Sequence, residues 1–148
     1  IYLPDFKYYS KELSAKYSHA RDYFEKAILA IQEMYRQVGA PVFEESTGMM
    51  KRGMIVRHLV LPGQVKDSKK ILRYLFETYG NNIYISIMNQ YTPLPHVAHI
   101  PELNRRVTPE EYNRVMDFAL RLGIENAFIQ EGETAEESFI PPFDMEGV

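Results

Sequence analysis

Asp5 and Lys7 are the first residues in the chain whose types and spacing suit ligand binding. They are two positions apart, so an extended backbone places both side chains on the same side. The carboxylate can accept hydrogen bonds from ribose hydroxyls, and the ammonium can donate to hydroxyls or to a carboxylate. The alternative is a solvated ion pair at the end of a strand.

Arg57 and His58 are neighbours within the apolar segment 53–63. Consecutive side chains of a strand point to opposite faces, so one of the two faces the ligand side and the other packs under a helix. A buried guanidinium without a partner is very costly, which predicts an anionic partner such as a carboxylate for Arg57. We interpret His58 as a hydrogen-bonded core histidine rather than as a catalytic base.

A third polar set, Asn89, Gln90, Tyr91 and Thr92, follows the apolar run 83–88. Such a cluster suits recognition of adenine or of an amino acid, although turn chemistry alone would explain Asn89 and Thr92. In parallel α/β proteins ligands bind beyond the carboxyl ends of the strands, so all three sets stand where a ligand would be expected.

A metal site receives little support from the sequence. His96 and His99 are three residues apart in a proline-rich segment, but the sequence places no third ligand near them. The chain has no cysteine, which excludes a disulfide, a thiolate zinc site, a cysteine nucleophile and a cysteine-ligated iron–sulfur cluster within these 148 residues. We therefore expect no metal ligands in this chain.

Apolar side chains that recur every three or four residues predict three amphipathic helices. They cover 20–38, 68–79 and the segment between Thr108 and Gly123, where Thr108-Pro109-Glu110-Glu111 forms a capping box. The residues expected to start or end the first two helices are Ser18, Gly39 and Pro41, then Asp67 or Ser68 and Gly80.

Four short apolar runs, at 1–3, 54–61, 83–88 and 127–130, predict strands that are covered on both faces. Strands that alternate with helices indicate an α/β fold in which parallel strands are joined by right-handed crossovers. Such a β-α-β-α-β-α-β chain is either a small open sheet or about half of a barrel that needs about 250 residues. The chain starts inside an expected strand without an initiator Met, which favours the half barrel and a longer parent protein.

Two further segments fit neither element type. Residues 89–107 contain Pro93, Pro95 and Pro101 and are expected to form a long functional loop. Residues 131–148 are acidic and are expected to extend over the surface, beside a main domain of residues 1–130.

Composition limits the classes of partner. The 17 Lys and Arg residues against 20 Asp and Glu residues give a net charge of −3, which predicts neither a nucleic acid nor a membrane surface as partner. The apolar runs are far shorter than the roughly 18 residues that a membrane helix needs. With no targeting segment visible, we expect a cytoplasmic protein.

Three motifs together resemble the C-terminal part of a radical S-adenosylmethionine (SAM) enzyme of the pyruvate formate-lyase activating enzyme-like family. They are Tyr2-Leu3-Pro4-Asp5-Phe6-Lys7-Tyr8, Val56-Arg57-His58-Leu59-Val60-Leu61-Pro62-Gly63 and Ile87-Met88-Asn89-Gln90-Tyr91-Thr92-Pro93. They resemble, in order and with compatible spacing, the family's Asp-Leu-Lys strand end, its Arg-Tyr-Val-Val-Val-Pro-Gly strand and the strand end that follows. The resemblance covers nearly the whole chain.

The resemblance implies a fold and a set of SAM contacts. The fold would be an incomplete (β/α)6 TIM-like barrel, of which this chain supplies the C-terminal half from about the fourth strand onward. Asp5 and Lys7 would contact the ribose of SAM, and Arg57 would lie near its methionine moiety. Gln90 or Tyr91 stands where the classical activating enzyme has a histidine.

The family's Cys-x3-Cys-x2-Cys loop, which holds the [4Fe–4S] cluster, has no counterpart in the chain and would belong upstream of Ile1. By resemblance, the parent enzyme would cleave SAM reductively to a 5′-deoxyadenosyl radical that abstracts hydrogen from a substrate. The implied partner is a glycyl radical enzyme or another protein substrate. This chain alone would be inactive and, with open sheet edges, would self-associate.

Two other functions stay open at this point. The chain could be a non-catalytic α/β module that holds a protein partner. It could also be part of a barrel enzyme that uses Lys7 as a Schiff-base nucleophile.

Overall fold

The structure is a computed structural model that describes residues 1–93, 95–130 and 137–139. Its main sheet has the order β3-β4-β5-β6. Strands β3 (Ile55–Leu59), β4 (Tyr84–Met88) and β5 (Ala127–Gln130) are parallel, as the sequence predicts. Strand β6 (Glu137–Phe139) pairs antiparallel with β5 and lies in the segment 131–148, where the sequence predicted no strand.

The start of the chain runs parallel to β3, on the edge opposite β4. The amide of Tyr2 donates to the Gly53 carbonyl at 3.1 Å, and the amide of Phe6 donates to the Arg57 carbonyl at 2.8 Å. Pro4, between them, has no N–H to complete the pattern, so the pairing stays irregular. The expected first strand is therefore in the expected place, but it is not a regular strand.

The structure has four α-helices in its described part: α1 (Lys11–Ser18), α2 (Tyr23–Val38), α3 (Val65–Tyr79) and α4 (Pro109–Leu122). The last three match the predicted helices, and α4 begins with the predicted capping box. Helix α1 was missed because it has no apolar stripe, and Ser14 is its one buried residue. Its start does carry a sequence signal, since the Ser10 hydroxyl accepts a hydrogen bond from the Leu13 amide.

Two predicted helix starts were wrong. Ser18 ends α1 instead of starting α2, and its hydroxyl lies 2.8 Å from that of Tyr8. Asp67 and Ser68 lie inside the first turn of α3, where their side chains bond to other segments instead of capping the helix. Side-chain oxygens at a helix start can satisfy any nearby donor, and sequence does not show which donor the fold brings close.

A short hairpin of β1 (Val42–Phe43) and β2 (Met50–Arg52) was not predicted. Its strands are too short to produce an alternating pattern of apolar residues. The hairpin reaches the face of the main sheet opposite α3, where the ring of Phe43 lies 5.8 Å from that of Tyr84.

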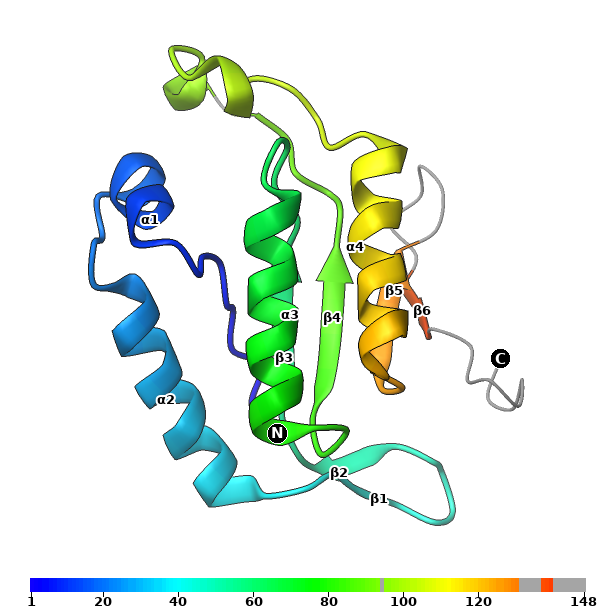
Figure 1. The fold of residues 1–148 in the computed structure, drawn as a ribbon. Coiled ribbons are helices and arrows are strands. Elements are labelled where there is room, and N and C mark those ends of the chain that lie inside the picture. The colour runs from blue at the N-terminus through cyan, green and yellow to red at the C-terminus, as the bar shows by residue number, and fades with distance from the viewer. Residues whose placement is uncertain (94, 131–136, 140–148) are drawn as a thin grey trace.

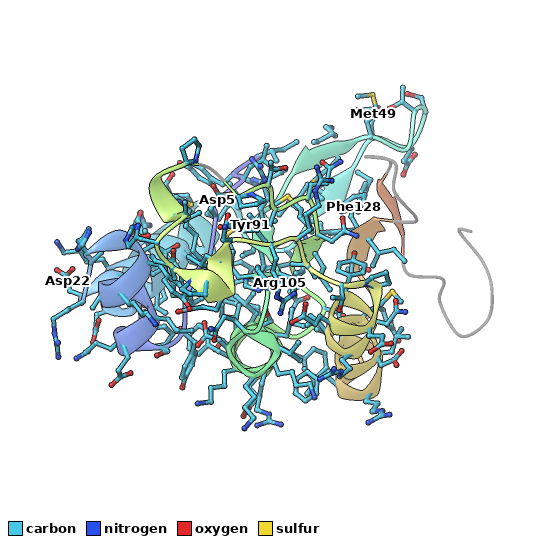
Figure 2. The ribbon with its side chains drawn as sticks, turned by 90° about the horizontal axis from the view of Figure 1, so that it is seen from above. Asp5, Asp22, Met49, Tyr91, Arg105 and Phe128 are labelled. Carbon is cyan, nitrogen blue, oxygen red and sulfur yellow. The ribbon has the colours of Figure 1, made fainter. Side chains whose placement is uncertain are left out.

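Helices α3 and α4 cover one face of the main sheet (Figure 1). Seen from above, they lie on one side of the strands and the hairpin lies on the other (Figure 2). Along each strand, side chains that face the helices alternate with side chains of the opposite face. Those that face the helices are buried: Val56, His58, Ile85, Ile87, Ala127 and Ile129. The helix side of the sheet therefore forms the core.

None of the helices in the described part of the chain is long and apolar enough to cross a membrane. The fold confirms a mixed α/β class with a small parallel sheet. Closure of this sheet into half of a barrel stays a prediction. Most of the predicted acidic tail, 131–136 and 140–148, lies outside the described residues.

Candidate functional site

A cavity of about 280 Å³ lies at the carboxyl ends of the strands. Four of the five predicted ligand-binding residues line it: Asp5, Lys7, Arg57 and Tyr91. The remaining lining residues, which sequence reasoning missed, are Tyr8, Leu59, Leu61 and Met88. The tertiary structure thus gathers polar residues from three separate sequence motifs around one space.

Asp5 and Arg57 form the charged pair of this cavity. The two residues are bridge partners across the parallel backbones, and Arg57 Nε lies 3.5 Å from Asp5 Oδ1. The Asp5 and Arg57 side chains are 49% and 46% exposed, so the guanidinium is not buried. Asp5 supplies the predicted anionic partner. An exposed pair at this distance contributes about 0–1 kcal/mol, so a ligand can displace it at little cost.

Tyr23 of α2 fixes the direction of the backbone at Asp5 and Lys7. Its hydroxyl accepts a hydrogen bond from the Lys7 amide at 2.8 Å and donates one to the Asp5 carbonyl at 3.2 Å. Burial raises the pKa of Tyr23, so the hydroxyl stays protonated and able to donate. Asp5 and Lys7 both line the cavity.

Tyr91 and Gln90 line different spaces. The Tyr91 hydroxyl donates to the Leu103 carbonyl at 2.9 Å, which anchors its loop to the short helical turn η2 (Pro101–Leu103). Tyr91 also borders a second cavity of about 740 Å³, and Gln90 lines only that one. Of the two alternatives, Tyr91 is the one that lines the cavity of Asp5. Figure 2 shows Asp5 and Tyr91 close together, seen from the strand ends.

His58 is a core residue, as the sequence suggests. Its Nδ1 donates to the Phe6 carbonyl at 2.8 Å, and its Nε2 accepts from the Ser68 hydroxyl at 2.7 Å. A carbonyl can only accept, so these contacts require the proton to sit on Nδ1. Burial lowers the pKa of His58 to about 4. Both ring nitrogens are thus used in joining the chain start to β3 and α3, and neither faces the cavity.

Glu111 holds the loops beside the cavities. Its carboxylate accepts from the Gly63 amide at 2.6 Å, from the Thr108 amide at 3.0 Å and from Arg105 at 2.8 and 3.0 Å. The Arg105 guanidinium is the main reason that its pKa falls to about 2. The capping box predicted the bond to Thr108, but the link to the loop after β3 depends on tertiary contact.

Among the described residues, no group of three or more His, Cys, Asp or Glu side chains could hold a metal ion. His99 is exposed, and the side chain of His96 lies outside the described residues. The alternative of a histidine metal pair gains no support from this part of the chain.

Comparison with known proteins finds a distant relative. The chain is 24% identical over 127 residues to the uncharacterized protein MJ0674 of Methanocaldococcus jannaschii. The match covers 84% of this chain and 32% of that protein, so the chain spans about a third of the length of the curated relative it matches. No family model and no solved structure matches the chain.

Proposed function

We propose that this chain is the C-terminal part of a radical SAM enzyme that resembles the pyruvate formate-lyase activating enzymes. In this proposal, the cavity of Asp5, Lys7, Arg57 and Tyr91 binds part of SAM. One observation carries it: four of the five residues expected from the family motifs line a single cavity at the strand ends. Their sequence separation of up to 86 positions makes this convergence informative.

The lining residues suit the parts of SAM. A carboxylate accepts from ribose hydroxyls, and a guanidinium and an ammonium together match a methionine carboxylate. The aromatic and aliphatic side chains offer an apolar surface to a base. The volume of about 280 Å³ is near the lower end of ligand pockets, which are roughly 300–1,000 Å³, so other segments would complete the site.

Each residue then has a definite task. Asp5 orients the ribose, and its backbone position is fixed by Tyr23. Arg57 exchanges its weak contact with Asp5 for the ligand carboxylate, and Lys7 adds a second positive charge. Tyr91 limits the space available on the loop side. Binding of SAM beside a reduced cluster supplies the radical chemistry, and the thiolates for that cluster must come from outside this cysteine-free chain.

The exposure of Lys7 argues against its use as a Schiff-base nucleophile. Desolvation activates such lysines, whereas Lys7 is exposed at the cavity rim, and Arg57, the cation that shares the cavity, is paired with Asp5. We retain a glycyl radical enzyme or another protein as the proposed partner, and the cytoplasm as the proposed location.

The test uses the full-length gene product, reconstituted anaerobically with iron and sulfide. We expect SAM binding by equilibrium dialysis and formation of 5′-deoxyadenosine. Asp5→Ala and Arg57→Ala should each weaken SAM binding about tenfold or more, as expected for loss of a charge-assisted hydrogen bond. Asp22→Ala and Arg36→Ala remove the same charges from exposed helical pairs and serve as matched controls.

A gene that encodes no three-cysteine loop, together with no SAM binding at millimolar concentration, would overturn the proposal. Capture of a protein partner by a chain that never binds SAM would instead support the non-catalytic module. Equal effects of the cavity variants and their controls would place the SAM site elsewhere.

A further inference from the structure

The cavity of about 740 Å³ beside the proposed SAM site lies in the size range of sites for small organic ligands. It is lined by Asn89, Gln90, Tyr91, Thr92 and the segment Arg106 to Pro109. Tyr91 belongs to both cavities, so they are direct neighbours. A molecule in the larger cavity would therefore lie beside the ligand in the smaller one.

Arg106 dominates the charge of this larger cavity. No acidic side chain is among the described residues that line it. The neighbouring Arg105 is bound to Glu111 at 2.8 and 3.0 Å, so its charge is already compensated. In contrast, no described side chain forms an ion pair with the exposed Arg106 guanidinium.

Uncharged hydrogen-bonding groups accompany this cation. Gln90 and Thr92 are exposed, and they offer an amide and a hydroxyl to the same space. The guanidinium binds a carboxylate through two parallel hydrogen bonds, and the amide side chain can both donate and accept. One cation balances one carboxylate, whereas a phosphate group would bring up to two negative charges.

We propose that this cavity binds the substrate and that the substrate is a polar monocarboxylate with an amide or hydroxyl group. Arg106 binds the carboxylate, and Gln90 and Thr92 bind the polar remainder. This inference rests on the proposed function, because it assigns the substrate side of the same site. The role of Arg106 is recognition only, so no bond is made or broken by this chain's residues there.

Binding of two matched probes tests the assignment in the full-length protein. N-acetylalanine carries a carboxylate and an amide, and N-acetylalaninamide has the same shape without the charge. By ligand-observed saturation-transfer NMR, we expect the acid to bind at least about tenfold more tightly than the amide. Inorganic phosphate, the third probe, should not compete with the acid at equal concentration.

Variants separate this inference from the proposed SAM site. Arg106→Ala should weaken N-acetylalanine binding about tenfold, Arg106→Lys should retain part of it, and Arg121→Ala, on the last turn of α4, should have no effect. Asp5→Ala should weaken SAM binding and leave N-acetylalanine binding intact. Equal binding of the acid and the amide, a preference for phosphate, or an unaffected Arg106→Ala would each overturn the substrate assignment while leaving the SAM proposal standing.

Discussion

At the scale of single residues, two buried titratable groups make the stability of the fold depend on pH. His58 bonds through both ring nitrogens, and Glu111 accepts from two amides and one guanidinium. Their pKa values, about 4 and about 2, lie below the usual values of these side chains. Because both pKa values are lowered, the native state is more stable at neutral pH than at acid pH. The two groups act in separate pH ranges.

For His58, the unfolded chain takes up a proton below pH about 6.5, whereas the folded chain does so only below about 4. The free energy of unfolding should therefore fall by about 2–3 kcal/mol as the pH drops across this range, at about 1.4 kcal/mol per pKa unit. Urea titrations of the wild type at pH 7, 5.5 and 4 measure the slope. His58→Gln should be less stable at pH 7 but should lose this slope. The exposed His99→Gln is the control, and an unchanged slope in His58→Gln would contradict the assignment.

For Glu111, the stabilisation is complete above pH about 4.5 and is lost as the pH falls to about 2. The pKa difference corresponds to about 3–4 kcal/mol. Glu111→Gln should therefore lower the melting temperature at pH 6, with a gap to the wild type that closes toward pH 2. Glu110→Gln, at the exposed neighbouring position, should leave the wild-type curve unchanged. If the difference in melting temperature between the wild type and Glu111→Gln stayed constant with pH, the stabilising contacts of Glu111 would not depend on its charge.

At the scale of elements, a carboxylate of α3 holds the backbone just before α1. Asp67, in the first turn of α3, accepts from the amides of Tyr9 at 2.9 Å and Ser10 at 2.8 Å, just before α1 starts. Burial raises the pKa of Asp67, and the two amide bonds oppose this shift. Helix α1 has one buried residue of its own, so it depends on contacts with other segments: this carboxylate at its start, and the bonds of Lys16 and Tyr17 to Glu102 farther along.

We expect Asp67→Ala to leave two amides without an acceptor and to destabilise the protein by about 2–3 kcal/mol. Hydrogen exchange should become faster at Tyr9 and Ser10 and throughout α1, while β4 should stay protected. Asp22→Ala, which breaks an exposed pair with Lys26, should cost less than about 1 kcal/mol. Equal exchange rates in wild type and Asp67→Ala would show that α1 is held by other contacts.

At the scale of the whole molecule, the irregular edge formed by residues 1–6 is the main liability. Its bonds to β3 use Tyr2, Pro4 and Phe6, so the backbone groups of Leu3 point to the other side. Leu3 is also 55% exposed, next to the exposed Ile1. An apolar edge with unpaired amides is a template for a second strand.

We therefore expect the 148-residue chain on its own to self-associate at micromolar concentration, as measured by multi-angle light scattering. Leu3→Glu should shift it toward monomer, because a charge at this edge opposes pairing. Leu29→Glu, at a leucine of α2 that is 64% exposed, is the matched control and should not change association. A monodisperse wild-type monomer would mean that this edge is protected.

Local sequence signals determined a large share of the fold. The apolar period and the capping box located α2, α3 and α4, because helix periodicity and caps depend on residues within a few positions. Short apolar runs located β4 and β5 in the same way. The opposite orientations of Arg57 and His58 follow from the alternation of side chains along a strand.

Only the tertiary structure decided which distant segments contact one another. From the sequence, Asp5, Lys7, Arg57 and Tyr91 were separate candidates for ligand binding. Parallel pairing of residues 2–6, β3 and β4 placed them around one cavity. In the tertiary structure, Gln90 lines a second cavity, and Asp67, Ser68 and Glu111 form hydrogen bonds with other elements. Such partners depend on which chain segments become neighbours. That choice follows from packing of the whole sheet against its helices, which no short window of residues encodes.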